Sequence, residues 1–188
     1  MILRLRLDLN IWCLDLNIWC AFLLANKKGL ENTACQSLVN IVREGICELG
    51  CVQLIISWGM LDRLYLALVN KKIGVSESTA QDYVRTIQAY AEAGIVGGPQ
   101  LTLGGTGVIP LGDVEDRHVL ETALAGNASV LVTRNFKHFL SKDTHIIEVD
   151  KHLIYPNSGK SLHIVHPYLM AEWIRTDNIP NVNKLLRI

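Results

Sequence analysis

The chain has 188 residues, a length that suits one well-buried core and is too short for two domains of ordinary size. Hydrophobic residues make up 49% of it and charged residues 19%, which excludes a disordered chain. The formal net charge of zero excludes a strongly basic nucleic-acid-binding coat. The five cysteines form no C-x-x-C pair, which favours reduced thiols in a cytoplasmic protein over a disulfide framework. No uninterrupted apolar stretch approaches the roughly 20 residues of a membrane span, so no membrane segment is expected.

A perfect tandem repeat lies near the start of the chain. The heptapeptide LDLNIWC occupies residues 7–13 and again residues 14–20. Because seven residues make two helical turns, we expect the duplication to lie inside one element, where a helix absorbs it without rotating its buried face. A first strand is expected within residues 3–16, leading into a helix that runs through Ala25.

Helix and strand patterns then alternate along the chain. Helices are expected over residues 30–48 (with Leu38, Ile41, Val42 and Ile46 on one stripe), 60–70, 78–93 (with Ser78 opening a capping box), 115–124 and 167–175. Buried strands are expected at 52–57, 129–133 and 145–149, and a glycine-rich loop at 100–110. This alternation predicts an α/β fold, a central parallel sheet with helices on both faces. Functional sites on such sheets lie at the carboxyl ends of the strands.

Oxygen-bearing side chains follow the ends of these strands. The first strand ends in Asp-Leu-Asn in either copy of the repeat, and Asp62 lies one turn into the helix after the second strand. Asp113 and Asp116 begin a later helix, and Asn135 follows the strand at 129–133. Four distant segments therefore bring oxygen ligands to one sheet edge, which is the ligand chemistry that Mg²⁺ or Mn²⁺ prefers.

The order of four motifs resembles the PIN domain, and more narrowly its branch of VapC-type toxin nucleases. The motifs are D-L-N, S-W-G-M-L-D-R-L, D-V-E-D-R-H-V-L-E-T-A and L-V-T-R-N-F-K-H-F. The resemblance covers residues 3–149, is most specific over 113–139, and leaves 150–188 as a closing segment packed on that core. It implies a single PIN-like three-layer sandwich over residues 1–188 and a Mg²⁺- or Mn²⁺-dependent endoribonuclease. Such enzymes are often the toxin half of a toxin–antitoxin pair, so RNA is the implied substrate and an antitoxin the implied partner.

The resemblance also implies a role for each matching residue. The implied metal ligands are Asp15 (with Asp8 as the alternative), Asp62, Asp116 and Asn135, the three acids also being catalytic. The family usually carries aspartate at the position of Asn135, so the site has one negative charge fewer, which Asp113 would partly restore.

Thr133, Arg117 and Arg134 are the implied substrate-binding residues. Thr133 would orient a carboxylate or a water at the strand end, and each arginine would meet a phosphate through its guanidinium fork. Between the two copies of the repeat we favour Asp15 over Asp8. Residues 11–14 make a more apolar strand than residues 3–7, which carry two arginines.

Other interpretations of these features remain open. An acid at a helix start is often only a cap, and an acid such as Asp62 is often only a solvated helix residue. Asn135 and the duplication favour a PIN-like fold that has lost activity and serves as a binding or assembly module. A magnesium-dependent phosphatase is a third hypothesis, which leaves the D-x-x-D-R-H helix unexplained. The low charge fraction and apolar residues such as Trp58 and Tyr168 predict a homodimer or a hetero-complex.

Overall fold

The structure is a computed structural model that describes residues 9–94, 98–99, 114–156 and 161–186; the side chains of 114–116 and 183–184 are outside this description. The expected loop at 100–110 therefore lies outside the described residues. Within the described ranges, no helix is long and apolar enough to cross a membrane.

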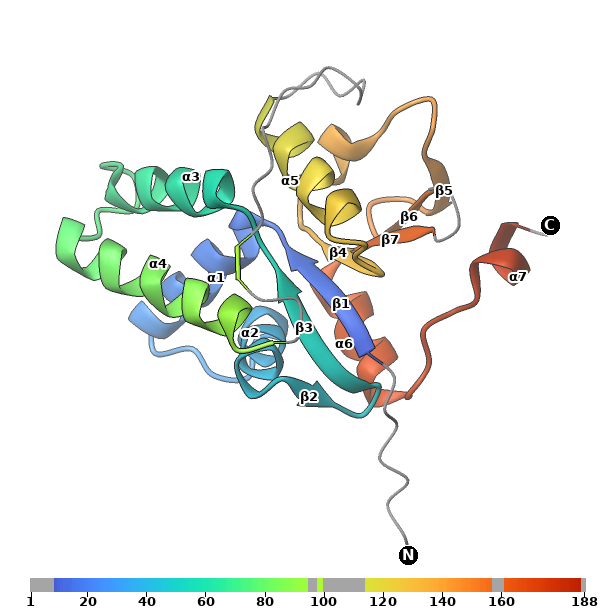
Figure 1. Cartoon of the computed structure of the whole chain (residues 1–188), viewed down its shortest axis with the longest axis horizontal. Helices are drawn as coiled ribbons and strands as arrows, with labels where there is room; N and C mark the ends of the chain where they lie inside the picture. The colour runs from blue at the N-terminus through green and yellow to red at the C-terminus, as the bar shows by residue number, and fades with distance from the viewer. Residues whose placement is uncertain (1–8, 95–97, 100–113, 157–160, 187–188) are drawn as a thin grey trace, which may run out of the picture.

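A seven-stranded sheet forms the centre of the molecule, with the strand order β2-β3-β1-β4-β7-β6-β5 (Figure 1). The four central strands β3, β1, β4 and β7 are parallel, and the strands at both edges are antiparallel. The strands are β1 (Leu9–Leu14), β2 (Ile46–Cys47), β3 (Gly50–Ile55), β4 (Val130–Val132), β5 (His145–Glu148), β6 (His152–Tyr155) and β7 (Leu162–Val165).

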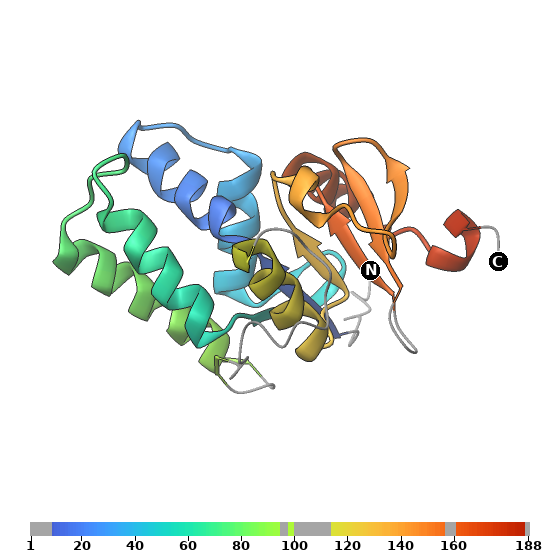
Figure 2. The ribbon, with the colours of Figure 1, turned by 90° about the horizontal axis from the view of Figure 1, so that it is seen from above.

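Helices cover both faces of this sheet. Helices α4 and α5 lie on one face and α2 and α6 on the other, as the two views in Figures 1 and 2 show. The α/β three-layer arrangement expected from the sequence is thereby confirmed. The helices are α1 (Leu16–Lys27), α2 (Ala34–Glu44), α3 (Trp58–Val69), α4 (Glu77–Glu92), α5 (Val114–Ala125), α6 (Pro167–Arg175) and α7 (Val182–Leu186), with a short 3-10 helix η1 (Phe136–Phe139).

The tandem repeat does not lie in one element, so that expectation was wrong. The segment LNIWC of the first copy forms most of β1, whereas the identical segment of the second copy forms the first turns of α1. Strand β1 pairs with β3 and β4 on its two sides, and these pairings hold the first copy extended. The second copy begins at the last strand residue and continues into the apolar helix sequence AFLLA. Tertiary context therefore decides the conformation of this pentapeptide.

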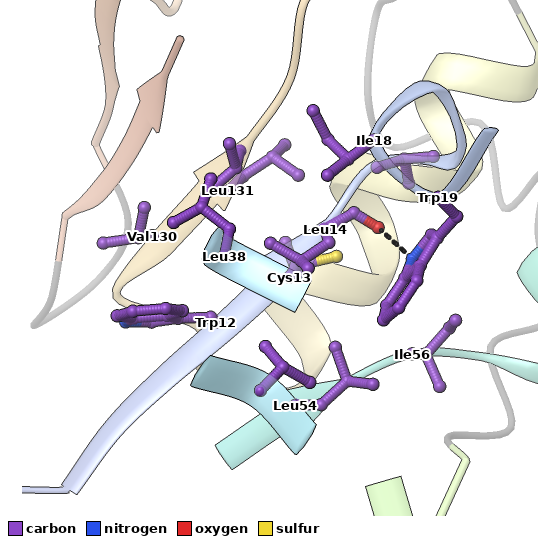
Figure 3. Packing of buried hydrophobic residues seen from close by; sticks show 14 of the residues in the cluster. Trp12, Cys13, Leu14, Ile18, Trp19, Leu38, Leu54, Ile56, Val130 and Leu131 are labelled. Carbon is purple, nitrogen blue, oxygen red and sulfur yellow. Dashed lines mark hydrogen bonds between the residues drawn. The ribbon is translucent and has the colours of Figure 1, made fainter. Parts of the chain in front are cut away.

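Both tryptophans of the repeat are fully buried (Figure 3). Trp12 projects from β1 into the core beside Leu54 and Val130 on the neighbouring strands. Trp19 projects from α1, and its indole nitrogen donates a hydrogen bond of 3.2 Å to the carbonyl of Leu14. This bond ties the first turn of α1 to the end of β1 and so fixes the strand-to-helix corner.

Two strand expectations need correction. Residues 145–149 were expected to form a buried strand, but β5 is an exposed antiparallel edge strand, with Ile146 56% exposed and Val149 72% exposed just beyond it. The buried parallel neighbour of β4 is instead β7, which the sequence pattern did not reveal. The two histidine-bearing strands β6 and β7 form a hairpin that closes this side of the sheet.

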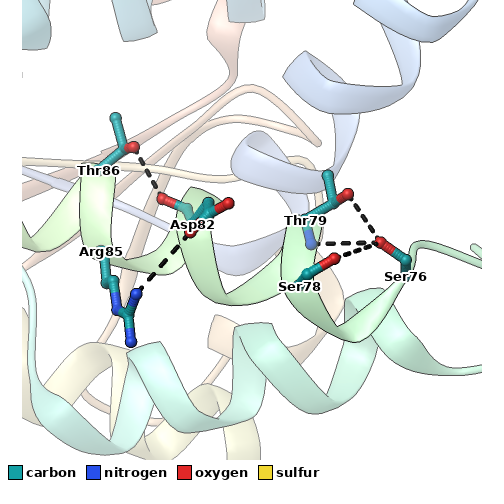
Figure 4. A network of polar contacts seen from close by, with 6 residues as sticks. All are labelled: Ser76, Ser78, Thr79, Asp82, Arg85 and Thr86. Atoms are coloured by element: carbon teal, nitrogen blue, oxygen red, sulfur yellow. Dashed lines mark hydrogen bonds and ion pairs between the residues drawn. The ribbon is translucent and has the colours of Figure 1, made fainter.

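Helix boundaries differ from the expected ones by small amounts, for local reasons. The N-cap of α4 is Ser76, whose hydroxyl accepts from the backbone N–H of Thr79 at 3.2 Å, and Ser78 lies inside the helix (Figure 4). Helix α2 ends at Gly45, which adopts the left-handed conformation (φ 72°) that terminates helices. Ile46, expected on the helical stripe, therefore lies in β2 and is 46% exposed.

Candidate active site

The corner between β1 and α1 places Asp15 at the carboxyl edge of the central strands. Its backbone is extended (φ −62°, ψ 154°) and it is the N-cap residue of α1. Its N–H donates to the carbonyl of Val132 at 3.0 Å, and its carbonyl accepts from the N–H of Ile18 at 2.9 Å. The residue is only 4% exposed. Strand β4 and helix α1 thus hold this carboxylate in one position.

Two polar side chains orient the Asp15 carboxylate. The Thr133 hydroxyl and the Asn17 amide both donate to Oδ2 of Asp15, each at 2.6 Å. The Asn17 amide nitrogen also lies 3.2 Å from the Thr133 hydroxyl oxygen. Thr133 is fully buried and follows the last residue of β4. A buried carboxylate that accepts two hydrogen bonds at one oxygen is fixed in orientation as well as in position.

Residues 134 and 135 continue the same network through their backbone. The N–H of Asn135 donates to Thr133 Oγ1 at 2.9 Å, and the N–H of Arg134 donates to Asn17 Oδ1 at 3.2 Å. The Asn135 side-chain nitrogen lies 2.9 Å from Nδ1 of His138, which leaves its amide oxygen as the group able to accept from water or bind a cation. The loop after β4 is therefore attached to the first turn of α1.

A second group of contacts joins α3 to α5 next to this corner. Ser57 is fully buried and caps α3, and its hydroxyl lies 2.9 Å from that of Thr122 on α5. The His118 ring packs against Gly59, where an added Cβ would lie 1.8 Å from Nε2. A side chain at this position would have to displace the His118 ring, so glycine permits the close approach of α5. These contacts hold the middle of α5, from His118 to Thr122, beside the first turn of α3.

Several residues expected in the site are not joined to Asp15 by the described contacts. Asp62 lies on α3 and is exposed, and in the described part of the chain no hydrogen bond or ion pair connects it to another residue. Arg117 lies on α5 and is half-buried. Asp8 and Asp113 lie outside the described residues, as does the side chain of Asp116. The convergence of the acids at one edge thus stays a prediction.

Burial and the charge of Asp15 favour the protonated thiol at both Cys13 and Cys20. Burial, followed by the negative charge of Asp15, raises the pKa of the Cys20 thiol to about 11. The same two causes raise the pKa of fully buried Cys13 even further. Protonated thiols bind metal poorly, so the oxygens define the chemistry of this edge.

Those oxygens have the character that a hard divalent cation requires. The Asp15 carboxylate and the Asn135 amide oxygen belong to neighbouring segments at the carboxyl edge of the sheet. The described residues include no group of three or more His, Cys, Asp or Glu side chains able to hold a metal. The oxygen ligands are therefore of the type that Mg²⁺ or Mn²⁺ prefers, and the expected ligands Asp62 and Asp116 would supply the additional oxygens that such an ion needs.

Sequence reasoning missed the residues that support the site. Asn17 was seen only as part of the D-L-N motif, although it bonds to Asp15, Thr133 and the backbone of Arg134. Its position two residues after the acid was the available signal. The roles of Ser57 and Gly59 depend on contacts with α5, which no local pattern reveals.

Comparison with known protein families identifies the fold. The family model of the PIN domain matches residues 12–137, a segment that includes Asp15, Thr133 and Asn135. The chain therefore belongs to the PIN-domain family, whose members are generally nucleases that depend on divalent metal ions and typically act on RNA. Comparisons with curated proteins and with solved structures find no match.

Proposed function

We propose that this protein is a Mg²⁺- or Mn²⁺-dependent endoribonuclease that hydrolyses phosphodiester bonds in RNA. The observation that carries the proposal is the buried Asp15 carboxylate, oriented by Thr133 and Asn17 at the carboxyl edge of a PIN-domain sheet. Burying a carboxylate costs several kcal/mol of solvation, and such a group is usually retained for function.

Asp15, Asp62, Asp116 and Asn135 are the residues that would hold the cation. A bound divalent ion would polarise the scissile phosphate and activate water for its attack. Thr133 keeps the Asp15 carboxylate facing the edge, and its own hydroxyl is fully occupied by one donated and two accepted hydrogen bonds. Arg117 and Arg134 would bind phosphates of the substrate beside the reacting bond.

The proposed biological role is that of the toxin in a type II toxin–antitoxin system in the cytoplasm. The partner would then be an antitoxin protein, and we expect the chain to form a homodimer as well. Trp58, which is 42% exposed, is suited to such an interface. Sedimentation of the protein alone, and purification with the product of a neighbouring short gene, test these two partners.

The first experiment measures cleavage of single-stranded and structured RNA during a titration with Mg²⁺ and Mn²⁺. Cleavage should require one of these ions and stop when EDTA is added. Asp15→Asn removes the charge but keeps the shape, so it should reduce the rate by orders of magnitude. Asp8→Asn is the matched control, because it changes the equivalent acid of the other repeat copy and should leave the rate near that of the wild type.

Two further variants test the rest of the ligand set. Asp116→Asn should reduce the cleavage rate as strongly as Asp15→Asn, with the fold intact by circular dichroism. Asn135→Asp should tighten metal binding, since it restores the charge that the family usually carries there. Cleavage that is indifferent to metal, or equal in wild type and Asp116→Asn, would disprove the nuclease proposal.

Asn135 supports a second candidate, a PIN domain that binds without cutting. An amide at the fourth ligand position lowers the negative charge of the site and so weakens its hold on a cation. Calorimetric titration with Mn²⁺ separates the two candidates. A binding module would show no metal-linked heat in wild type, whereas the nuclease would bind the ion and lose it on Asp15→Asn.

A further inference from the structure

A cavity lies immediately beside the candidate active site. Its volume is about 300 Å³, and α1, the start of α2 and the start of α6 surround it. Its apolar lining includes small residues such as Ala21, Ala25 and Ala34. Its polar lining consists of Lys28, Thr33, Arg134, His166 and Tyr168, with no aspartate or glutamate among the lining residues. In a chain of zero net charge, this cavity carries a local positive charge.

Both cations of the cavity are available to a ligand. Across the residues that the structure describes, neither the Lys28 ammonium nor the Arg134 guanidinium forms an ion pair. Arg134 and Cys35 both line the cavity, and the positive charge of Arg134 partly opposes the rise that burial causes in the pKa of the Cys35 thiol. Two cations of this kind next to an apolar lining suit a ligand that is both anionic and ring-containing.

The cavity is connected to the carboxylate site by two elements of the structure. Asn17, Ala21, Ala25 and Lys28 lie at helical spacing on one face of α1, so this face runs from the Asp15 network to the cavity. From Asn17 to Lys28 the helix rises by about 16 Å. Arg134 provides the second connection, because its backbone N–H bonds to Asn17 while its side chain lines the cavity.

A row of aromatic rings borders the cavity on the α6 side. The ring of Phe136 stacks with His166 at 6.3 Å between centroids, and the His166 ring lies 5.2 Å from that of Tyr168. Tyr168 is 74% exposed and directly follows Pro167, which begins α6. An exposed ring held by a neighbouring ring at the rim of a cationic cavity is a suitable platform for stacking a nucleic-acid base.

We propose that this cavity binds one nucleotide of the single-stranded RNA that the carboxylate site cleaves. Lys28 and Arg134 bind phosphates of this stretch of RNA, and the base of the nucleotide stacks on Tyr168. The proposal rests on the proposed nuclease function and adds to it the position of the substrate chain, which runs along α1 from the Asp15 edge to the cavity.

The test measures binding separately from cleavage. A short fluorescein-labelled single-stranded RNA is titrated with the full-length protein in EDTA, and anisotropy gives Kd at several salt concentrations. Lys28→Glu should weaken binding about tenfold or more, and the slope of log Kd against log salt should fall by about 0.7 for each phosphate that the protein no longer neutralises. Tyr168→Ala should weaken binding about five- to a hundredfold because it removes the stacking surface, while Tyr168→Phe keeps the ring and stays within about twofold of wild type.

Arg85→Glu is the matched control, because it makes the same change of charge on the exposed face of α4, outside the cavity (Figure 4). Equal weakening by Lys28→Glu and Arg85→Glu would overturn the proposal, since it would indicate an effect of net charge. Wild-type protein that does not bind the RNA, or Lys28→Glu and Tyr168→Ala variants that bind it normally, would overturn it as well. The expected binding defects with no cleavage under any metal would disprove the nuclease and leave the nucleotide-binding cavity standing.

Discussion

Thr133→Val is the most informative single substitution, because valine matches threonine in shape and removes only the hydroxyl. That oxygen donates to Asp15 and accepts from Asn17 and from the backbone of Asn135. The bond to the carboxylate is charge-assisted and contributes about 1.5–3 kcal/mol, and each neutral bond about 1 kcal/mol. Because the three bonds share one oxygen they are not additive, and we expect a loss of about 3 kcal/mol in the free energy of unfolding.

Urea denaturation measures this loss. With a slope of about 2–3 kcal/mol per molar urea, the midpoint should fall by about 1 M. Thr133→Ser is the control, since it keeps the hydroxyl and removes one methyl group, worth about 1 kcal/mol. RNA cleavage should follow the same order, with serine close to wild type and valine strongly impaired. A Thr133→Val protein that is as stable as Thr133→Ser would refute the assignment of the hydroxyl as the organiser of this site.

Three other substitutions or conditions give equally specific expectations. Gly59→Ala should destabilise the protein by about 1–3 kcal/mol in the same urea assay, because the added Cβ would displace the His118 ring. Alanine favours helices over glycine, so a gain in stability would contradict the close contact. Trp19→Phe removes the hydrogen bond from the indole to the Leu14 carbonyl. It should lower the free energy of unfolding by about 1 kcal/mol in addition to the effect of the smaller phenylalanine side chain, and thermal denaturation measures the loss. His152 and His163 form a pair whose ring nitrogens lie 2.9 Å apart, and burial lowers the pKa of both rings to about 4. The unfolded chain therefore binds protons first, and stability should fall as the pH drops from about 6.5 to 4. The slope should be up to about 1.4 kcal/mol per pH unit for each proton that the folded pair does not bind. Stability that is flat across this window would show that these rings are not buried as neutral groups.

Alternating apolar runs and glycine stops were sufficient to predict the α/β fold. The helix at 167–175 was predicted with its bounds, because Pro167 supplies a strong local start signal. Strand β5 was predicted in place but not in environment, because the run HIIE is apolar enough to look buried while it lies at an unpaired edge. The hairpin β6–β7 was missed because its strands of four residues each carry a histidine, which hides an apolar run.

The parts of the site that follow strand ends were predictable, and the parts that depend on contacts between elements were not. Asp15 and Thr133 end neighbouring strands, so parallel pairing alone brings them together. The contact of Gly59 with His118 depends on how α3 and α5 cross, and sequence spacing carries no information about that. Whether Asp62 joins Asp15 depends likewise on side-chain directions, and the prediction from strand ends does not specify them.

Because one copy of the repeat forms a strand and the other begins a helix, the chain has an alternative alignment on the same fold, shifted by seven residues. A slip of seven residues would put Asp8 where Asp15 now lies and would move the preceding residues 2–7 into the place of β1. Arg6 would then occupy the position of Cys13, which is fully buried in a central strand. Burying an unpaired guanidinium there costs several kcal/mol, and this cost raises the free energy of the shifted alignment above that of the native one. The two arginines before the repeat thus act against the wrong alignment, and their replacement by apolar residues would reduce the free-energy difference between the two alignments.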